Sequence, residues 1–150
     1  MCFGKFTKPF AVATFATALS LCAGMAQAGD ELYKAFGRNE GIRKIIDDFV
    51  GIVVADSRVN FQFAKLDAAG VGRLKGHLVE MLCGATGGPC QYTGRDMKTT
   101  HAGMGVNDAQ FNAIAEDMYG AWDKNGVPYH LQNKVMAILA TMHKDIATKK

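Results

Sequence analysis

Apolar residues recur every three or four positions from residue 42 onward, and this spacing is the strongest constraint on the fold. Such spacing places apolar side chains on one face of an α-helix, whereas a half-buried strand needs strict alternation. No alternating run of that kind occurs after residue 29. The sequence therefore predicts an all-α domain. Its first long helix follows Asn39-Glu40 and carries an apolar face of Ile42, Ile45, Ile46, Phe49, Val50, Val53 and Val54.

Three more long helices follow the same pattern. The second covers residues 74–82, and the third begins after Asn107, a residue type that is favoured as an N-cap. The last begins after Pro128, which the first turn of a helix tolerates, and continues to Ile146. Short helical pieces are predicted around Leu32 and Met97.

Chain length and charge set further limits. With 150 residues, 49% of them hydrophobic and 21% charged, the chain has enough apolar material for one domain with a core. The formal net charge is +3, but beyond residue 28 only 15 basic residues oppose 14 acidic ones. A nucleic-acid-binding domain is normally more basic than this. We therefore expect no nucleic-acid partner.

The first 28 residues have the three parts of a secretory signal peptide. Lys5 and Lys8 precede an apolar run, residues 10–23, that is too short to span a bilayer, and Ala26-Gln27-Ala28 supplies the small residues of a cleavage site. We predict cleavage after Ala28, export to the periplasm, one domain over residues 29–150, and no membrane span after cleavage. A retained anchor and an amphipathic first helix are the alternatives.

Export changes the meaning of the two cysteines in the predicted mature chain, Cys83 and Cys90. An oxidising compartment permits a disulfide, and Gly87-Gly88-Pro89 between them lets the chain turn back. Two buried thiols are an equally good interpretation, because spacing alone does not fix the geometry that a disulfide requires. A zinc site is disfavoured, since neither a second cysteine pair nor a nearby histidine accompanies them.

His77 lies in the second long helix, and its spacing to Leu74, Leu78 and Met81 places it on their apolar side. Unpaired burial of a polar group costs about 1–3 kcal/mol, so this imidazole is expected to meet a hydrogen-bonding group, a metal or a cofactor. The residues alone favour a hydrogen-bonded core histidine over a ligand.

The remaining histidines differ in setting. His101 follows Met97 by one helical turn in a short segment, which can present one imidazole toward a flat ligand. His143 borders the apolar face of the last helix, and His130 has the features of a surface residue. No nucleophile elbow, zinc-protease motif, P-loop or dinucleotide-binding motif is present, so hydrolase, kinase and dehydrogenase chemistry has no visible carrier.

Short motifs follow one another in a fixed order along the chain. They are Leu32-Tyr33, Gly41-Ile42-Arg43, Asp47-Asp48-Phe49, Arg73-Leu74-Lys75-Gly76, Gly87-Gly88-Pro89, Tyr92-Thr93-Gly94-Arg95-Asp96-Met97, His101-Ala102-Gly103 and Gly126-Val127-Pro128. This series resembles group I truncated haemoglobins over residues 32–146, and its order and gaps make the resemblance specific. The resemblance implies a truncated globin, a two-over-two helical sandwich around haem b, whose iron binds diatomic gases.

The resemblance also implies roles for individual residues. It places His101 at the proximal iron-ligand position, with Met97 beside it and Phe63 against the haem face. A neutral imidazole on haem iron leaves its other nitrogen free to donate, commonly to a backbone carbonyl. Tyr92 and Arg95 match positions near the haem propionates. Ordinary core packing is the alternative role for Phe63 and Met97.

The distal side departs from the family. Relatives commonly carry a tyrosine at the position of Val50 and a glutamine at that of Leu78, and these two groups hydrogen-bond the gas ligand. Both are apolar here, which leaves His77 as the polar side chain able to reach the iron. The same position holds the distal ligand in some cyanobacterial members. We therefore predict bis-histidine coordination by His101 and His77 in the ligand-free state. The expected distal residues are Val50, Phe63, Leu74, Leu78, Met81 and Leu82.

The alternative keeps His77 turned outward to a propionate, over a five-coordinate iron. Elsewhere, Phe36-Gly37-Arg38 replaces the paired glycines that usually end the first helix, and residues 66–72 make the approach to the distal helix about three residues longer than usual. His143 lies within about one residue of a position at which some cyanobacterial relatives bond covalently to a haem vinyl group; a surface histidine is the alternative. Thioether attachment is not expected, since no Cys-x-x-Cys-His occurs.

Two functions from different classes follow from the resemblance. In the first, an exported haem protein binds O2, NO and CO and carries out redox chemistry on nitric oxide or reactive species, with nitric oxide dioxygenase and peroxidase-like activity as the enzymatic possibilities. In the second, a bis-histidine haem transfers single electrons in the periplasm without gas turnover. Both require an electron donor that the sequence does not identify. A helical binding domain without a cofactor is a third interpretation.

Overall fold

The computed structural model describes residues 31–149, and the predicted signal peptide, residues 1–28, lies outside them. This part of the chain consists of helices and loops, with one isolated backbone bridge between Asn107 and Lys149. The prediction of an all-α domain is confirmed. Among these residues, no helix combines the length and apolar character that a membrane span requires.

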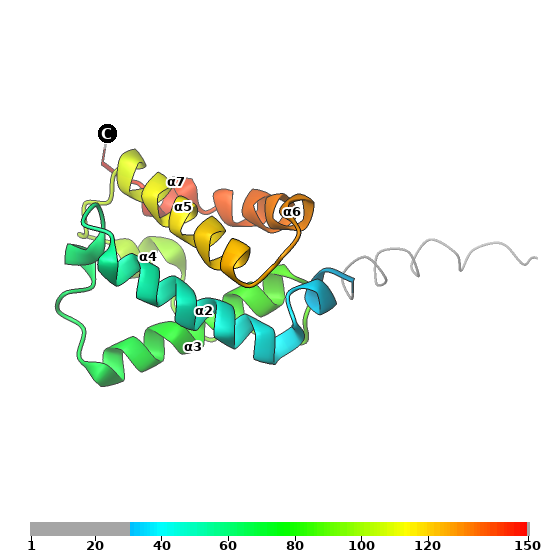
Figure 1. The fold of residues 1–150 in the computed structure, drawn as a ribbon. Coiled ribbons are helices and arrows are strands. Elements are labelled where there is room, and N and C mark those ends of the chain that lie inside the picture. The colour runs from blue at the N-terminus through cyan, green and yellow to red at the C-terminus, as the bar shows by residue number, and fades with distance from the viewer. Residues whose placement is uncertain (1–30, 150) are drawn as a thin grey trace, which may run out of the picture.

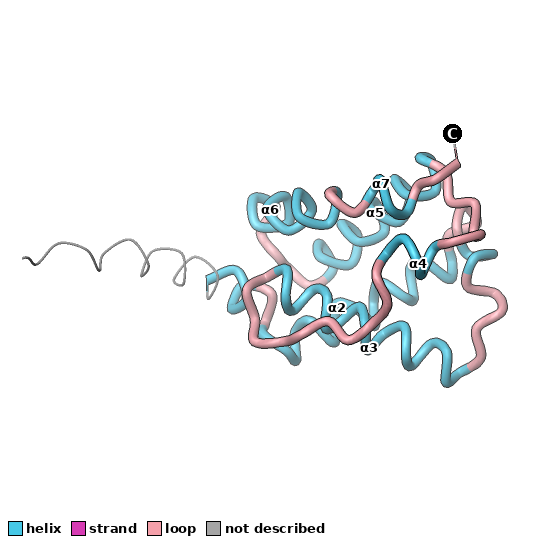
Figure 2. The backbone as a smooth tube through the Cα atoms, turned by 180° about the vertical axis from the view of Figure 1, so that it is seen from behind, coloured by secondary structure: helices cyan, strands magenta, loops and turns pink. Residues whose placement is uncertain are grey.

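The long helices form two layers. α2 crosses α3 in one layer, and α5 runs beside α6 in the other, as Figure 1 and the reverse view in Figure 2 show. This is the two-over-two arrangement that the sequence resemblance implied. A helical turn over residues 31–35 precedes α2. The elements are α2 (Arg38–Ala55), η1 (Asn60–Gln62), α3 (Ala68–Ala85), α4 (Met97–His101), α5 (Asp108–Lys124), α6 (Tyr129–Ala140) and α7 (His143–Ile146).

α2 carries the centre of the core because its buried face contacts both α3 and α5. Trp122 of α5 is fully buried and meets the ring of Phe36 edge-on, with 5.7 Å between the centroids. Val54, which the apolar pattern also placed on this face, is 54% exposed instead. The buried residues of α2 are Ile42, Ile45, Ile46, Phe49, Val50 and Val53.

The predicted N-cap of the third long helix is confirmed, whereas the second long helix, expected over residues 74–82, is longer and runs from Ala68 to Ala85. Asn107 caps α5, since its side chain accepts from the backbone N–H of Gln110 while the Gln110 side chain accepts from the backbone N–H of Asn107. Asp67 caps α3 by a single bond, since its side chain accepts from the backbone N–H of Gly70 at 2.7 Å. Such caps satisfy N–H groups that have no partner inside a helix.

The last predicted helix is two helices. α6 ends at Ala140 and α7 begins at His143, so the continuous helix expected up to Ile146 is wrong. The hydroxyl of Thr141 donates to the carbonyl oxygen of Ile138 at 2.7 Å, and the backbone N–H groups of Thr141 and Met142 bond three residues back rather than four. A threonine hydroxyl that competes for a helical carbonyl bends the helix. The break lets α7 pack against α4.

The turn into α2 has an unusual backbone. Gly37 has φ of 73°, and Arg38, the first residue of α2, has φ of 56°. Glycine adopts this left-handed region at little cost, whereas other L-residues are disfavoured there. The departure from paired glycines at this turn therefore leaves an arginine in a conformation that suits glycine.

Asp48 connects α2 to the end of α5. Lys124 and Asn125 donate to its two carboxylate oxygens at 2.7 and 2.8 Å. These hydrogen bonds, that from Lys124 first, lower the pKa of Asp48 below its ordinary value. A carboxyl group whose pKa is lower in the folded state stabilises the fold above its unfolded pKa, and this stabilisation is lost as pH falls through the folded pKa.

Replacing Arg38 with glycine should raise the free energy of unfolding by about 0.5–1 kcal/mol, because a left-handed residue costs about 1–2 kcal/mol and glycine loses part of that gain through backbone entropy. Urea denaturation of both proteins measures the difference. The matched control is Arg43→Gly in the middle of α2, which should lower stability by about 1 kcal/mol. Equal destabilisation by both substitutions would contradict the backbone argument.

Replacing Asp48 with asparagine should flatten the loss of stability in acid. The wild-type free energy of unfolding should fall as pH drops below about 4, while Asp48→Asn should start lower near pH 7 and fall less. Denaturation at about pH 7 and about pH 3 tests this. Asp47→Asn removes a neighbouring charge that has no bond to Asn125 and is the control. Parallel acid profiles for wild type and Asp48→Asn would contradict the prediction.

Candidate functional site

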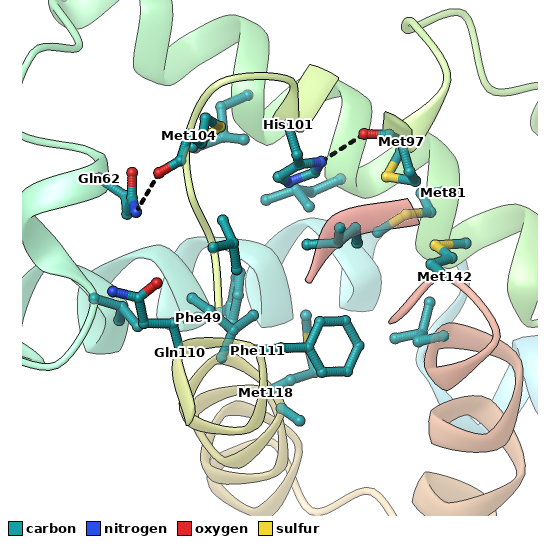
Figure 3. A pocket seen from close by; sticks show the side chains of 18 of the residues that line it. Phe49, Gln62, Met81, Met97, His101, Met104, Gln110, Phe111, Met118 and Met142 are labelled. Atoms are coloured by element: carbon teal, nitrogen blue, oxygen red, sulfur yellow. Dashed lines mark hydrogen bonds between the residues drawn. The ribbon is translucent and has the colours of Figure 1, made fainter. Parts of the chain in front are cut away.

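A cavity of about 190 Å³ lies between α3 and α4 on one side and α5, α6 and α7 on the other. Twenty residues line it, and only Gln62, His101 and Gln110 among them carry hydrogen-bonding side chains; none is charged. Figure 3 shows His101 on the opposite side of this space from Phe111 and Met118. An apolar space with few polar groups is typical of a binding site for a hydrophobic ligand.

His101 enters this cavity from the last residue of α4. Its Nδ1 lies 2.8 Å from the carbonyl oxygen of Met97 (Figure 3). A carbonyl oxygen only accepts, so Nδ1 carries the proton and donates. In the neutral ring, the lone pair is then on Nε2, which makes no hydrogen bond to any of the described residues. His101 is therefore held in the tautomer that can bind a metal through Nε2.

Short local structure fixes this imidazole. Asp96 caps α4 by accepting from the backbone N–H of Thr99 at 2.8 Å. Gly103 follows with φ of 78°, a left-handed conformation that lets the chain leave the helix at once. α7 packs on α4 as well, and its residue Ile146 lines the same cavity as His101. The ring is thus positioned by its own helix and by the end of the chain.

Several of the other residues singled out in the sequence also line the cavity, namely Phe63, Leu74, Leu78, Met81 and Met97. Val50 and Leu82 do not; both are buried in the core behind it. Tyr92 also lies outside the cavity, where its hydroxyl donates to the carbonyl oxygen of Arg95 at 2.9 Å. Five of the predicted cofactor contacts therefore share one cavity with His101, while Val50 and Tyr92 lie beyond its lining.

His77 does not line the cavity. Its side chain is 43% exposed, and its Nδ1 lies 3.3 Å from Oε2 of Glu80, one turn further along α3. The spacing predicted a buried position on the apolar side of α3, and that prediction is wrong. The Glu80 carboxylate gives the imidazole a polar partner near solvent instead. Coordination of iron by His77 stays a prediction.

Glu80 is itself held by the segment that follows α3. The backbone N–H and the hydroxyl of Thr93 both donate to its carboxylate, with shortest distances of 2.9 Å. These hydrogen bonds from Thr93 are the main cause of a lowered pKa for Glu80, with a smaller contribution from His77. The ring of Tyr92 lies against His77, with centroids 5.8 Å apart. His77 thus belongs to a polar cluster at the edge of the cavity.

His143 lies next to the cavity without lining it. Its ring meets Phe111, a lining residue, edge-on with 4.7 Å between centroids, and its Nε2 lies 3.0 Å from Oδ1 of Asp108. One aromatic ring therefore separates His143 from the cavity. Its covalent link to a cofactor stays a prediction.

Cys83 and Cys90 are joined by a disulfide, with their Cα atoms 5.7 Å apart. Cys83 is fully buried at the end of α3. The backbone N–H of Gly88 donates to the carbonyl oxygen of Cys83 at 2.8 Å, which closes the turn between the two cysteines. The loop before α4 is in this way tied to α3.

Sequence reasoning missed one shared property of the lining. Every methionine of residues 31–149 faces the cavity, although only Met81 and Met97 were singled out as contacts. Methionine is unbranched and polarizable, so it adapts to the shape of a ligand. The signal was available, because the methionines fall on the apolar faces of four different helices or their flanks. The others are Met104, Met118, Met136 and Met142.

Residues 31–148 match the model of the bacterial-like globin family. A group 1 truncated haemoglobin of Mycolicibacterium paratuberculosis is 31% identical over 117 residues, which are 78% of this chain and 84% of that protein. One from Synechocystis is 32% identical over 118 residues, which cover 75% of this chain and 93% of the relative.

Solved structures give the same result. The truncated haemoglobin of Tetrahymena pyriformis in its Fe(III) form has a TM-score of 0.73 and 25% identity, and covers 79% of this chain and 98% of its own. The 2/2 haemoglobin of Synechococcus, solved in the cyanomet state with covalently attached haem, has a TM-score of 0.70 and 28% identity over the same shares.

The cavity fits a haem. A macrocycle with apolar faces matches a lining without charged side chains, and its iron needs one protein nitrogen with a free lone pair, which His101 provides at Nε2. The family, the fold and the cavity agree on the same cofactor. The chain belongs to the bacterial-like globin family and is a group I truncated haemoglobin, which binds haem and, at the haem iron, diatomic gases.

Proposed function

We propose that His101 is the proximal ligand of haem b, that CO, NO and O2 bind on the opposite face, and that His77 is a reversible sixth ligand. The observation that carries the proposal is the single imidazole of His101 in a cavity whose other lining is almost entirely apolar. Haem supplies the redox-active iron when bound. The residues of this chain supply the axial nitrogen, the exclusion of water and the choice among gas ligands.

The imidazole of His101 is held in one orientation by its own helix. The Nδ1 hydrogen of His101 is donated to Met97, four residues earlier in the same short helix, so the acceptor moves with the ring. Such a partner fixes ring orientation and raises the basicity of the ligating nitrogen. A backbone carbonyl gives less negative charge to the ring than a carboxylate would, so the donor strength of His101 is moderate.

The face of the cavity opposite His101 favours gas ligands that gain little negative charge when they bind to iron. Leu74, Leu78 and Met81 of α3 offer no hydrogen-bond donor there. Gln62 donates its amide N–H to the carbonyl oxygen of Met104 at 3.4 Å, and Gln110 accepts with its side-chain oxygen from the backbone N–H of Asn107; both residues lie outside α3. A ligand that accumulates negative charge gains little in such surroundings. CO and NO are therefore expected to be retained better than O2, and long-lived oxygen storage is disfavoured.

His77 is an imidazole that can donate or coordinate, and it directly precedes Leu78, which lines this face of the cavity. To reach the iron it must leave Glu80. Because its side chain is 43% exposed, that movement does not require opening the core. We propose that the protein exchanges between His77 outside the cavity and His77 on the iron, and that gas ligands compete with it.

We further propose that the protein acts in an exported, oxidising compartment on nitric oxide or related reactive species. Residues 1–28 support this by their signal-peptide pattern, and the disulfide between Cys83 and Cys90 suits such a compartment. Repeated redox turnover requires an electron donor, which we propose to be a separate reductase.

Replacing His101 with alanine should weaken haem affinity by more than about 100-fold, since loss of an outer partner alone costs about 10–100-fold in metal affinity. Haem content after expression with excess haem measures the effect, and added imidazole should restore part of it. His130→Ala, which removes an exposed imidazole at the start of α6, is the control and should retain haem. Full haem content in His101→Ala would reject the proximal assignment.

Replacing His77 with alanine should remove the sharp paired visible bands of the dithionite-reduced protein and abolish any slow phase of CO binding, because no side chain then competes for the sixth position. Absorption spectra and stopped-flow CO binding on the chain from Gly29 test this. Identical broad spectra for wild type and variant would exclude His77 as a ligand and leave a five-coordinate gas-binding site. Very slow CO binding without nitric oxide turnover in the wild type would favour electron transfer instead.

A further inference from the structure

The orientation of His77 depends on one carboxylate. Its Nδ1 lies 3.3 Å from Oε2 of Glu80, and the two residues are three apart on α3, a spacing at which side chains on a helix meet. Both side chains are partly exposed, at 43% and 30%. The bond turns the ring toward solvent, away from the side of α3 on which Leu78 and Met81 line the cavity.

Glu80 is more firmly placed than an exposed glutamate usually is. Thr93 donates to it twice, from its backbone N–H at 2.9 Å and from its hydroxyl at 2.9 and 3.1 Å to the two oxygens. Two donors on one carboxylate, the single hydroxyl hydrogen being shared between its two oxygens, restrict its rotamers, so the entropy cost of holding His77 is largely met before His77 binds.

The disulfide brings Thr93 to this place. Cys83 follows Glu80 by three residues on α3, and Cys90 precedes Thr93 by three. The bond between the two cysteines therefore fastens the segment that carries Thr93 to the end of the helix that carries His77. On the same segment, Tyr92 places its ring against His77 at a 62° angle between the ring planes.

We infer that Glu80, anchored by Thr93, is a positioning residue that holds the His77 imidazole outside the cavity and so sets the fraction of molecules in which His77 binds the haem iron. The inference rests on the proposed role of His77 as the sixth ligand. The ring that donates Nδ1–H to Glu80 faces solvent, so moving Nε2 to the iron breaks this bond. Glu80 and the iron compete for one side chain.

Removing the carboxylate should shift this competition. An exposed hydrogen bond of this kind corresponds to about a two- to tenfold change in an equilibrium constant. Glu80→Ala is therefore expected to raise the ratio of His77-bound to His77-free iron by about two- to tenfold. Glu80→Gln keeps an oxygen that accepts from His77 and Thr93, and should stay close to wild type. Thr93→Val, which removes only the hydroxyl donor, should lie between them.

The experiment uses the haem-bound chain from Gly29 at one fixed pH. Ferric and dithionite-reduced absorption spectra give the low-spin fraction, and stopped-flow CO binding gives the amplitude of the phase limited by His77 release. Glu40→Ala, which removes an exposed carboxylate in the first turn of α2, is the matched control and should leave both readouts unchanged. Haem content and helical circular dichroism verify that each variant is folded.

The His77→Ala/Glu80→Ala double variant makes the test specific. A rise in the low-spin fraction in Glu80→Ala that disappears in the double variant supports the inference. If His77→Ala loses the low-spin signal but Glu80→Ala equals wild type, the inference is overturned while the proposed sixth ligand stands. If neither wild type nor Glu80→Ala shows any His77-dependent signal, the inference and the sixth-ligand proposal both fail.

A second pair of substitutions tests the anchor. Mass spectrometry without reductant should first show Cys83 linked to Cys90 in the wild type. The Cys83→Ser/Cys90→Ser protein should then change the low-spin fraction in the same direction as Glu80→Ala, because Thr93 is less firmly placed. An unchanged fraction in a folded, haem-bound protein would overturn the part assigned to the disulfide.

Discussion

The apolar face of α2 is the constraint on which the rest of the domain depends. α3 and α5 each pack on α2 far more extensively than on each other, so they do not close on each other along their whole length. Phe49 marks the place where they part, since it belongs to the core and also lines the cavity. Apolar side chains around such a space give water few partners, so the space favours an apolar occupant. A haem that binds only the folded chain then stabilises the fold by mass action.

Helices, caps and the proximal ligand could be predicted because their causes are local or regular. A three-and-four spacing suffices to find the buried face of α2, and Asn107 with Gln110 forms a capping box within four residues. His101 could be found from its neighbours and from the order of family motifs. The end of α6 could not, because the hydrogen bonds of Thr141 to a carbonyl three residues back and the packing of α7 on α4 occur together only in the folded chain.

The direction of His77 could not be predicted from spacing for a related reason. Periodicity indicates which side of a helix meets the core, but a residue at the boundary of that side follows whichever partner is nearer. That partner is Glu80, whose own position depends on Thr93, thirteen residues away along the chain and beyond the disulfide. The cysteine spacing allowed a bridge without requiring one. Only the folded chain brings His77, Glu80 and Thr93 together.

His101 and His77 show how one side chain acquires two behaviours. Each uses Nδ1 for a bond to oxygen, but His101 bonds to a backbone carbonyl of its own helix, which cannot move away without unwinding α4. His77 bonds to a carboxylate near solvent that Thr93 also satisfies, so the imidazole can leave without orphaning a buried group. An imidazole whose hydrogen-bond acceptor cannot move away suits a permanent iron ligand. An imidazole that can leave its acceptor suits an exchangeable ligand. In the proposed bis-histidine state, the oxygen partners of the two imidazoles therefore determine which histidine stays on the iron and which one exchanges.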